Sequence, residues 1–290
     1  MSTTLTLLRA ALASPLKRPG ATPRLPGSRL HLPAARIDPA HLAAYAEVCR
    51  FPAPGTGPGT GPRPRPLPLP YPHVLAFPLA MRLMAARAFP LPVLGLVHTG
   101  IGITRHHALL PDDRPDLTVY ARELRPHRRG TEVVVVTEAR LAGDLAWESH
   151  STYLARHDRG TAPERARTAT APKPAGPVPA LPVLARWHLP GDLGRRYGRA
   201  SGDFNPIHLH PLTARALGFP RAIAHGMWTL ARCLAEHGEG DPTRVRAEFK
   251  APVPLPSTVA YAADEDTGAF ELRSPDGKLH LTGHIRSTGP

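Results

Sequence analysis

YAEVCRFPAP, at residues 45–54, aligns without a gap with YGRASGDFNP, at residues 197–206. The same offset also superimposes a His residue that precedes a long apolar run in each part of the chain. Self-similarity at a fixed period is the sequence signature of a duplicated structural unit. The chain is therefore expected to contain two halves with one fold. The aligned pairs are Tyr45 with Tyr197, Cys49 with Ser201, Pro54 with Pro206, and His73 with His225.

Each half is predicted to contain a helix, a loop, a buried helix and then several antiparallel strands. Asp38 and Pro39 suit the cap and the first residue of a helix. Residues 73–89 are apolar nearly all round, which predicts a buried helix. Runs rich in Val, Thr and Tyr with partial alternation predict strands. The predicted strands cover residues 117–125, 131–141, 145–156, 181–189, 243–253, 257–264, 269–274 and 279–287.

The length of 290 residues favours about two domains. We expect an N-terminal domain over residues 1–160, a linker over 161–180 and a C-terminal domain over 181–290. The linker is indicated by its abundance of Pro, Ala and charged residues. A second Pro- and Gly-rich segment, residues 51–70, can form neither a helix nor a central strand.

The composition restricts the possible partners. The chain has a formal net charge of +13, but it lacks the zinc-ligand cluster, the RNP-like aromatic motif and the Lys/Arg run that would indicate nucleic acid binding. Two cysteines outside any CxxC motif favour a reducing compartment. No apolar run approaches the roughly 18–20 residues of a membrane span. The N-terminal segment is interpreted as a surface helix rather than a targeting peptide, and we expect a cytoplasmic protein.

The two halves differ at a cluster of polar residues that occurs only in the second half. The second half has carboxylate, amide and imidazole side chains where the first has mainly apolar ones. Side chains that merely stabilised the shared fold would need polar counterparts in the first half. We therefore expect one working site, in the second half, and one supporting half. The contrasting pairs are Asp203 with Phe51, Asn205 with Ala53, His208 with Thr56, and Gly226 with Val74.

The polar cluster admits three interpretations. Asp203 and Asn205 are turn formers, so the segment can be a solvated turn. His208, His210 and His225 would supply metal ligands beside the carboxylate, but His208 and His210 are two residues apart and would point opposite ways in an extended loop. Alternatively, Asp203 and His208 can converge across a proline-fixed turn on one water molecule, with one group removing a proton and the other supplying one.

In the acid–base interpretation the neighbouring residues have defined roles. The carboxylate beside the imidazole would fix its tautomer and raise its basicity. Asn205 can orient the water or a substrate oxygen, and Gly202 allows tight backbone geometry at the loop entrance. Gly226 begins a buried apolar helix, where a free N–H would stabilise a developing oxyanion. Gly226 can also be a small residue under a tight packing contact.

The segment from Tyr197 to Met227 resembles the signature of the MaoC-like dehydratases, also called R-specific enoyl-CoA hydratases. That signature combines an aromatic residue, a small residue, Gly-Asp-x-Asn-Pro-[Ile/Leu]-His, an alanine and a later His-Gly. The matching residues are Tyr197, Ser201, Gly202, Asp203, Asn205, Pro206, Ile207, His208, Ala214, His225 and Gly226. The resemblance is close over about thirty residues and looser over the strands that follow. The Pro- and Gly-rich segment of the first half departs from the pattern.

The resemblance implies an α+β double hot-dog fold, with two antiparallel sheets that each wrap around a central helix. It implies reversible syn addition of water to a trans-2-enoyl thioester, giving the (3R)-3-hydroxyacyl thioester. Asp203 and His208 would activate the water, with neither assigned as the base, Asn205 would orient it, and the Gly226 N–H would bind the thioester oxygen. No metal and no redox cofactor are needed, because the thioester acidifies the α-carbon.

Coenzyme A or acyl carrier protein would be the handle of the substrate. Arg199, Arg221 and Lys250 are the candidates for contacts with its phosphates. Two other functions stay open on the same fold, a thioesterase and a non-catalytic subunit that binds acyl thioesters. A homodimer also stays open, because two hot dogs in one chain already mimic the usual dimer.

Overall fold

The structure, a computed structural model, describes residues 24–53, 65–93, 95–157, 181–238 and 243–287. Its strands form one ten-stranded sheet in which neighbouring strands are antiparallel. The strands are β1 (Arg29–Leu32), β2 (Leu96–Arg105), β3 (Asp116–His127), β4 (Gly130–Leu141), β5 (Asp144–Arg156), β6 (Val183–Leu189), β7 (Arg244–Phe249), β8 (Ser257–Asp264), β9 (Ala269–Arg273) and β10 (Leu279–Arg286). The helices are α2 (Pro39–Cys49), α3 (Tyr71–Ala85), α4 (Leu193–Ser201), α5 (Pro206–Leu209), α6 (Pro211–Ala216) and α7 (Gly226–Glu236).

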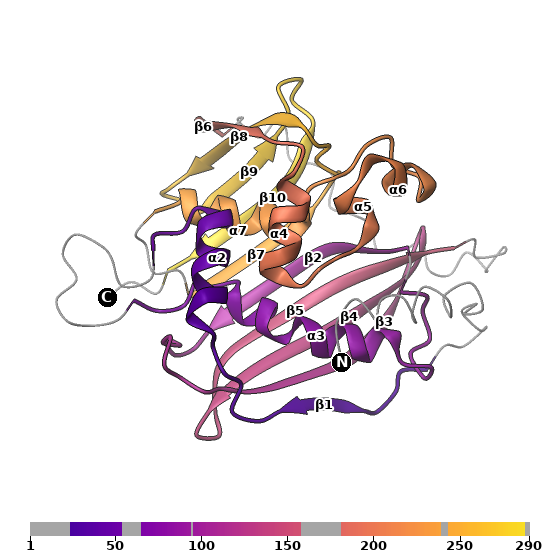
Figure 1. The fold of residues 1–290 in the computed structure, drawn as a ribbon, viewed down its shortest axis with the longest axis vertical. Helices are drawn as coiled ribbons and strands as arrows, with labels where there is room; N and C mark the ends of the chain where they lie inside the picture. The colour runs from indigo at the N-terminus through magenta and orange to yellow at the C-terminus, as the bar shows by residue number, and fades with distance from the viewer. Residues whose placement is uncertain (1–23, 54–64, 94, 158–180, 239–242, 288–290) are drawn as a thin grey trace.

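The order of the strands confirms that the halves share one topology. The sheet runs β1-β3-β4-β5-β2-β7-β10-β9-β8-β6, so the five strands of each half follow the same sequence outward from the centre. At the centre β2 pairs with β7, from Gly100 opposite Glu248 to Thr104 opposite Arg244. The two predicted sheets are therefore joined edge to edge into one continuous sheet (Figure 1).

The long helices lie on one face of this sheet. In Figure 1, α3 crosses the strands of the first half and α7 lies over those of the second. The equivalent helices α2 and α4 meet between them, with the rings of Tyr45 and Tyr197 6.2 Å apart between centroids. The indole N–H of Trp228 in α7 donates to the carbonyl oxygen of Val48 in α2 at 2.9 Å. The halves thus share one hydrophobic core rather than packing as separate units.

Local sequence accounts for most of these elements. The Asp38 carboxylate accepts a hydrogen bond from the N–H of Ala40 at 2.9 Å, which caps α2 as predicted. Residues 133–136 are four consecutive valines at the centre of β4, and all are buried. The buried helix α3 includes Pro78 but ends at Ala85, four residues before the predicted end at 89. The chain leaves the helix at Ala86, whose ψ of 143° is extended.

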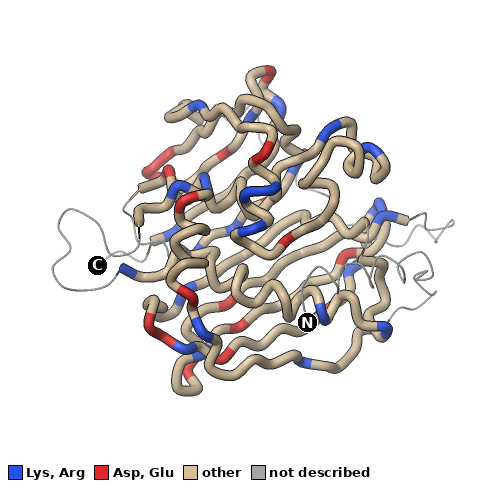
Figure 2. The backbone as a smooth tube through the Cα atoms, in the orientation of Figure 1, with Lys and Arg blue, Asp and Glu red and all other residues tan. Residues whose placement is uncertain are grey.

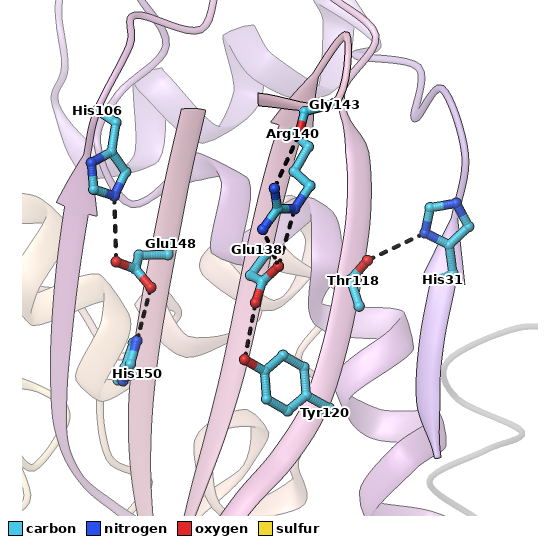
Figure 3. A network of polar contacts seen from close by, with 9 residues as sticks. All are labelled: His31, His106, Thr118, Tyr120, Glu138, Arg140, Gly143, Glu148 and His150. Atoms are coloured by element: carbon cyan, nitrogen blue, oxygen red, sulfur yellow. Dashed lines mark hydrogen bonds and ion pairs between the residues drawn. The ribbon is translucent and has the colours of Figure 1, made fainter. Parts of the chain in front are cut away.

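The face of the sheet away from the helices carries polar side chains. In the first half, Glu148 of β5 bridges His106 and His150, at 3.3 Å and 3.0 Å (Figure 3). On the neighbouring strands Glu138 accepts hydrogen bonds from Tyr120 and Arg140. This alternation of apolar and polar faces is typical of a half-solvated antiparallel sheet.

Two strands, β1 and β2, have no counterpart among the predicted ones. The expected linker and the N-terminal segment before residue 24 lie outside the described residues, as does Thr56.

Among the helices that the structure describes, none is both long and apolar enough to cross a bilayer.

Candidate active site

The site begins at the turn between α4 and α5. Gly202 ends α4 with a φ of 74°, a left-handed conformation that favours glycine. The next residue, Asp203, accepts a hydrogen bond from the N–H of Asn205 at 3.1 Å through Oδ1. The Asn205 side-chain oxygen in turn accepts from the N–H of Ile207 at 3.4 Å and caps α5. The turn residues of the sequence therefore do shape a turn, and this turn aims a carboxylate at His208.

Residues 206–209 form the short helix α5, so the extended loop assumed in weighing the metal interpretation does not occur. The helix places His208 inside the protein, with 8 % of its surface exposed. His210 leaves the site, because it is exposed and caps α6 by accepting from the N–H of Leu212 at 3.2 Å. Gly194 of α4 packs directly against α5, because a Cβ at this position would overlap the backbone carbonyl of His208.

A backbone carbonyl fixes the tautomer of His208. Its Nδ1 lies 2.8 Å from the carbonyl oxygen of Ile223. A carbonyl only accepts hydrogen bonds, so Nδ1 carries the hydrogen and the neutral ring keeps its lone pair on Nε2. We expected Asp203 to fix the tautomer, and this detail was wrong. The carboxylate is left available for another partner.

The spacing of the polar groups suits one bridging water. Asp203, His208 and His225 each offer one atom to a set in which all atoms lie within 4.8 Å of one another. Two hydrogen bonds from one water span about 4.5 Å at ordinary lengths and angles. The same three side chains have the donor types of a metal site. Both readings of the cluster thus fit the separation.

His225 contacts both of the other residues in the cluster. Its ring stacks on the ring of His208, with centroids 3.7 Å apart. Its Nε2 donates to the backbone carbonyl of Asp203 at 3.0 Å, while 3.9 Å separates the same nitrogen from the carboxylate. The ring of His225 also contacts the ring of Tyr197, with 4.9 Å between the centroids. With Nε2 used by the backbone, His225 holds Asp203 and His208 in place, a role that the sequence did not reveal.

Burial shifts the pKa of each group toward its neutral form. It raises the pKa of the Asp203 carboxyl, an effect that His208 opposes. It lowers the pKa of His208, and here the nearby carboxylate opposes the shift. The pKa of His225 falls well below its ordinary value because of burial and the neighbouring His208. His225 is therefore neutral at physiological pH, and Asp203 and His208 titrate as a coupled pair.

The N-terminus of α7 completes this wall of the site. Gly226 is the first residue of the helix and follows the cap His225. The first N–H groups of a helix have no partner inside it, and none of the described residues accepts from the Gly226 N–H. The glycine also serves packing, because an added Cβ would lie 3.1 Å from the ring of Phe249. Both interpretations of Gly226 therefore have a structural basis.

The opposite wall comes from the first half. The ring of Phe249 meets the ring of His98 at 4.9 Å, and His98 stacks on Tyr153 at 4.5 Å. Tyr153 lies close enough to Asp203 for the carboxylate to raise its pKa, in addition to the larger effect of burial. Burial lowers the pKa of His98 to about 3, and the atom Nε2 has no hydrogen-bond partner in the described part of the chain. No motif links these residues to the second half, so sequence reasoning missed them.

The three basic candidates do not converge on the site. Arg199 and Arg221 are exposed, and the guanidinium of Arg221 donates to the carbonyl of Pro256 at 3.5 Å. Lys250, which directly follows β7, forms an ion pair with Glu248 of that strand. The structure gives none of the three a contact with Asp203 or His208.

The fold and the site together define a class of protein. The MaoC like domain family matches residues 167–269, the part of the chain that includes the turn, His225 and the start of α7. The chain belongs to the MaoC-like dehydratases and is a hydro-lyase of that family. In particular, it is 36% identical to 3-hydroxyacyl-thioester dehydratase X of Mycobacterium tuberculosis over 285 residues, which cover 97% of this chain and 96% of that protein.

Solved structures agree with this assignment. The crystal structure of HtdX from Mycobacterium tuberculosis matches with a TM-score of 0.74 and 32% identity, over 90% of this chain and 100% of that one. A MaoC-like dehydratase from Phytophthora capsici matches with a TM-score of 0.69 over 93% of this chain and 98% of that one. Its identity is 16%, so it supports the double hot-dog fold alone.

Proposed function

We propose that the chain catalyses reversible syn addition of water to trans-2-enoyl thioesters of coenzyme A or acyl carrier protein, giving (3R)-3-hydroxyacyl thioesters. Asp203 and His208 hold the water between them. The observation that carries the proposal is the cluster in which Asp203, His208 and His225 offer polar atoms within 4.8 Å of one another, while Nδ1 of His208 is bonded to Ile223 so that the neutral ring keeps its lone pair on Nε2. The similarity to 3-hydroxyacyl-thioester dehydratase X of Mycobacterium tuberculosis supports the same substrate class.

The reaction needs only one water and one pair of proton acceptors. The water oxygen forms a bond to the β-carbon while one member of the pair takes a proton from it. The π electrons of the double bond move onto the α-carbon and the thioester oxygen. The pair then returns a proton to the α-carbon. Oxygen and proton are added from one face because a single pair of residues serves both steps, which gives syn addition.

The start of α7 supplies the electrostatic part of the mechanism. Negative charge develops on the thioester oxygen as the carbon–oxygen bond forms. A free N–H at a helix N-terminus stabilises such a charge, and the Gly226 N–H is placed to do so. The neutral His225 keeps a second positive charge away from His208, so that His208 stays able to accept a proton.

An absorbance assay tests the function. Purified protein should remove the enoyl absorbance of crotonyl-CoA without any added cofactor, and chiral analysis should find the (3R) product. Release of free thiol without loss of the enoyl group would identify a thioesterase instead. Binding of the thioester with no chemical change would indicate a non-catalytic subunit.

A chelator tests the metal reading of the same cluster. Dialysis against a strong chelator should leave the hydration rate unchanged, because the proposed reaction uses no metal. Loss of activity that returns with zinc would show that Asp203, His208 and His225 are ligands.

A further inference from the structure

The outer surface around α5 and α6 combines arginines with exposed leucines. We define it as the basic–apolar patch. Its members are Arg195 of α4, Leu212 and Arg215 of α6, and Leu217 and Arg221 in the segment that follows. Leu212 is 65% exposed and Leu217 is 42% exposed, which places both among the most exposed large apolar side chains of the described structure. Apolar side chains displayed between like charges are typical of a protein-binding surface.

The patch is built onto the element that carries His208. The guanidinium of Arg195 donates to the carbonyl of Leu209 at 3.1 Å, at the end of α5. The hydroxyl of Thr213 in α6 donates to the carbonyl of Pro206 at 2.7 Å. The segment after α6 returns to the same helix, because the N–H of Ile223 donates to the carbonyl of Ile207 at 3.1 Å. The elements that carry the patch are therefore bonded directly to α5, the helix that contains His208.

The charge of the patch is not neutralised locally. From Leu193 to Ala235 the sequence contains one acidic residue, Asp203, and this one belongs to the site. The guanidinium groups of Arg195, Arg215 and Arg221 donate to backbone carbonyls, and no carboxylate of the described residues forms an ion pair with them. Figure 2 shows Lys and Arg positions and no Asp or Glu position on the α6 end of the molecule.

We propose that the basic–apolar patch is the docking surface for an acyl carrier protein. The proposal rests on the proposed function, because a thioester enzyme receives its substrate on either coenzyme A or a carrier protein. Carrier proteins of this class are acidic and present apolar side chains beside the attached arm. Arginines suit their carboxylates, and the exposed leucines suit their apolar side chains. Coenzyme A would need cationic groups for its phosphates but offers nothing for two exposed leucines.

Kinetics with two carriers test the proposal. The variants are Arg215→Glu and Leu212→Asp, and the substrates are crotonyl-CoA and the crotonyl thioester of a bacterial acyl carrier protein. We expect kcat/KM for the carrier-protein substrate to fall roughly tenfold or more, and less steeply at high salt. For crotonyl-CoA, kcat/KM should stay within about twofold of the unmodified protein, because a rim charge acts mainly on association.

The control makes the same change of charge elsewhere. Arg36 lies in the connection between β1 and α2, and Arg244 begins β7 at the end opposite Phe249; both are exposed. Arg36→Glu and Arg244→Glu, each made singly, should leave the rates with both substrates unaffected. An equal loss on both carriers, or no loss on either, would overturn the docking surface. Failure of the unmodified protein to hydrate either substrate would instead overturn the proposed function.

Discussion

The tautomer of neutral His208 follows from a single backbone contact. Because the carbonyl of Ile223 accepts a hydrogen bond from Nδ1–H, the neutral ring has a lone pair, and not a donor, at Nε2. The carboxylate of Asp203 presents only acceptor atoms when ionised. In the proposed mechanism the pair accepts two hydrogen bonds from one water, which leaves a lone pair of the water oxygen for the substrate.

The need for a proton acceptor predicts an acid limit to activity. Burial raises the pKa of the Asp203 carboxyl and lowers that of His208, and we expect the acid limb in the interval between the ordinary values of the two groups, 3.8 and 6.5. We expect kcat/KM for hydration to fall as the pH drops through that interval, because the protonated pair cannot accept a proton from water. A pH profile with crotonyl-CoA measures this. An acid limb above the ordinary pKa of histidine would contradict the assigned protonation state.

At the scale of elements, the proposed role of the start of α7 can be separated from its packing role by substitution. In the proposed mechanism the Gly226 N–H binds the substrate, and the absence of a side chain at Gly226 also makes room for Phe249. Proline is well suited to the first position of a helix, where it removes only an unpaired N–H. The preceding residue must then be extended, and His225 already is, with a φ of -66° and a ψ of 135°.

A pair of variants follows from this geometry. Gly226→Ala adds a Cβ against Phe249 but keeps the N–H, while Gly226→Pro adds similar bulk and removes the N–H. We expect kcat of Gly226→Pro to be about 10²–10³-fold below that of Gly226→Ala, the usual cost of one oxyanion donor. Circular dichroism of both variants controls for the fold. Equal values of kcat would show that Gly226 serves packing alone.

The elements that escaped prediction show where local patterns fail. β2 contains Gly100 and Gly102, and glycine weakens the strand signal of a sequence. The structure explains Gly100, because a Cβ there would lie 3.2 Å from the carbonyl oxygen of Ala247 in β7. The glycine lets the two halves approach at their junction. By contrast, the valine run of β4 and the capped start of α2 were predictable, since their causes lie within a few residues of sequence.

At the scale of the whole molecule, the duplicated fold has one candidate site, and both halves contribute residues to it. The second half contributes Asp203, His208 and the helix start, and these could be predicted because the first half lacks them at the same offset. The first half contributes His98 and Tyr153, which come near the site through the β2–β7 junction. Their proximity depends on pairing between strands far apart in the sequence, so no local pattern encodes it.

The shared core predicts that the halves stabilise each other. Trp228→Phe removes the hydrogen bond to Val48 and leaves a buried carbonyl oxygen unsatisfied. We expect the free energy of unfolding in urea to fall by about 1–3 kcal/mol. Trp187→Phe is the matched control, because its buried indole N–H has no hydrogen-bond partner among the described residues. If the free energy of unfolding fell equally in both variants, the hydrogen bond between Trp228 and Val48 would contribute nothing measurable to stability.

The most direct test of the account is hydration of crotonyl-CoA by Asp203→Asn and His208→Gln beside the unmodified protein. Both substitutions are close in shape, and the asparagine oxygen can still accept from the N–H of Asn205, so both variants should unfold at the temperature of the parent. We predict that kcat falls at least about 10²-fold in each variant, the usual contribution of one acid–base group. Turnover near the parent rate in either variant, with the fold intact, would contradict the claim that these two side chains activate the water.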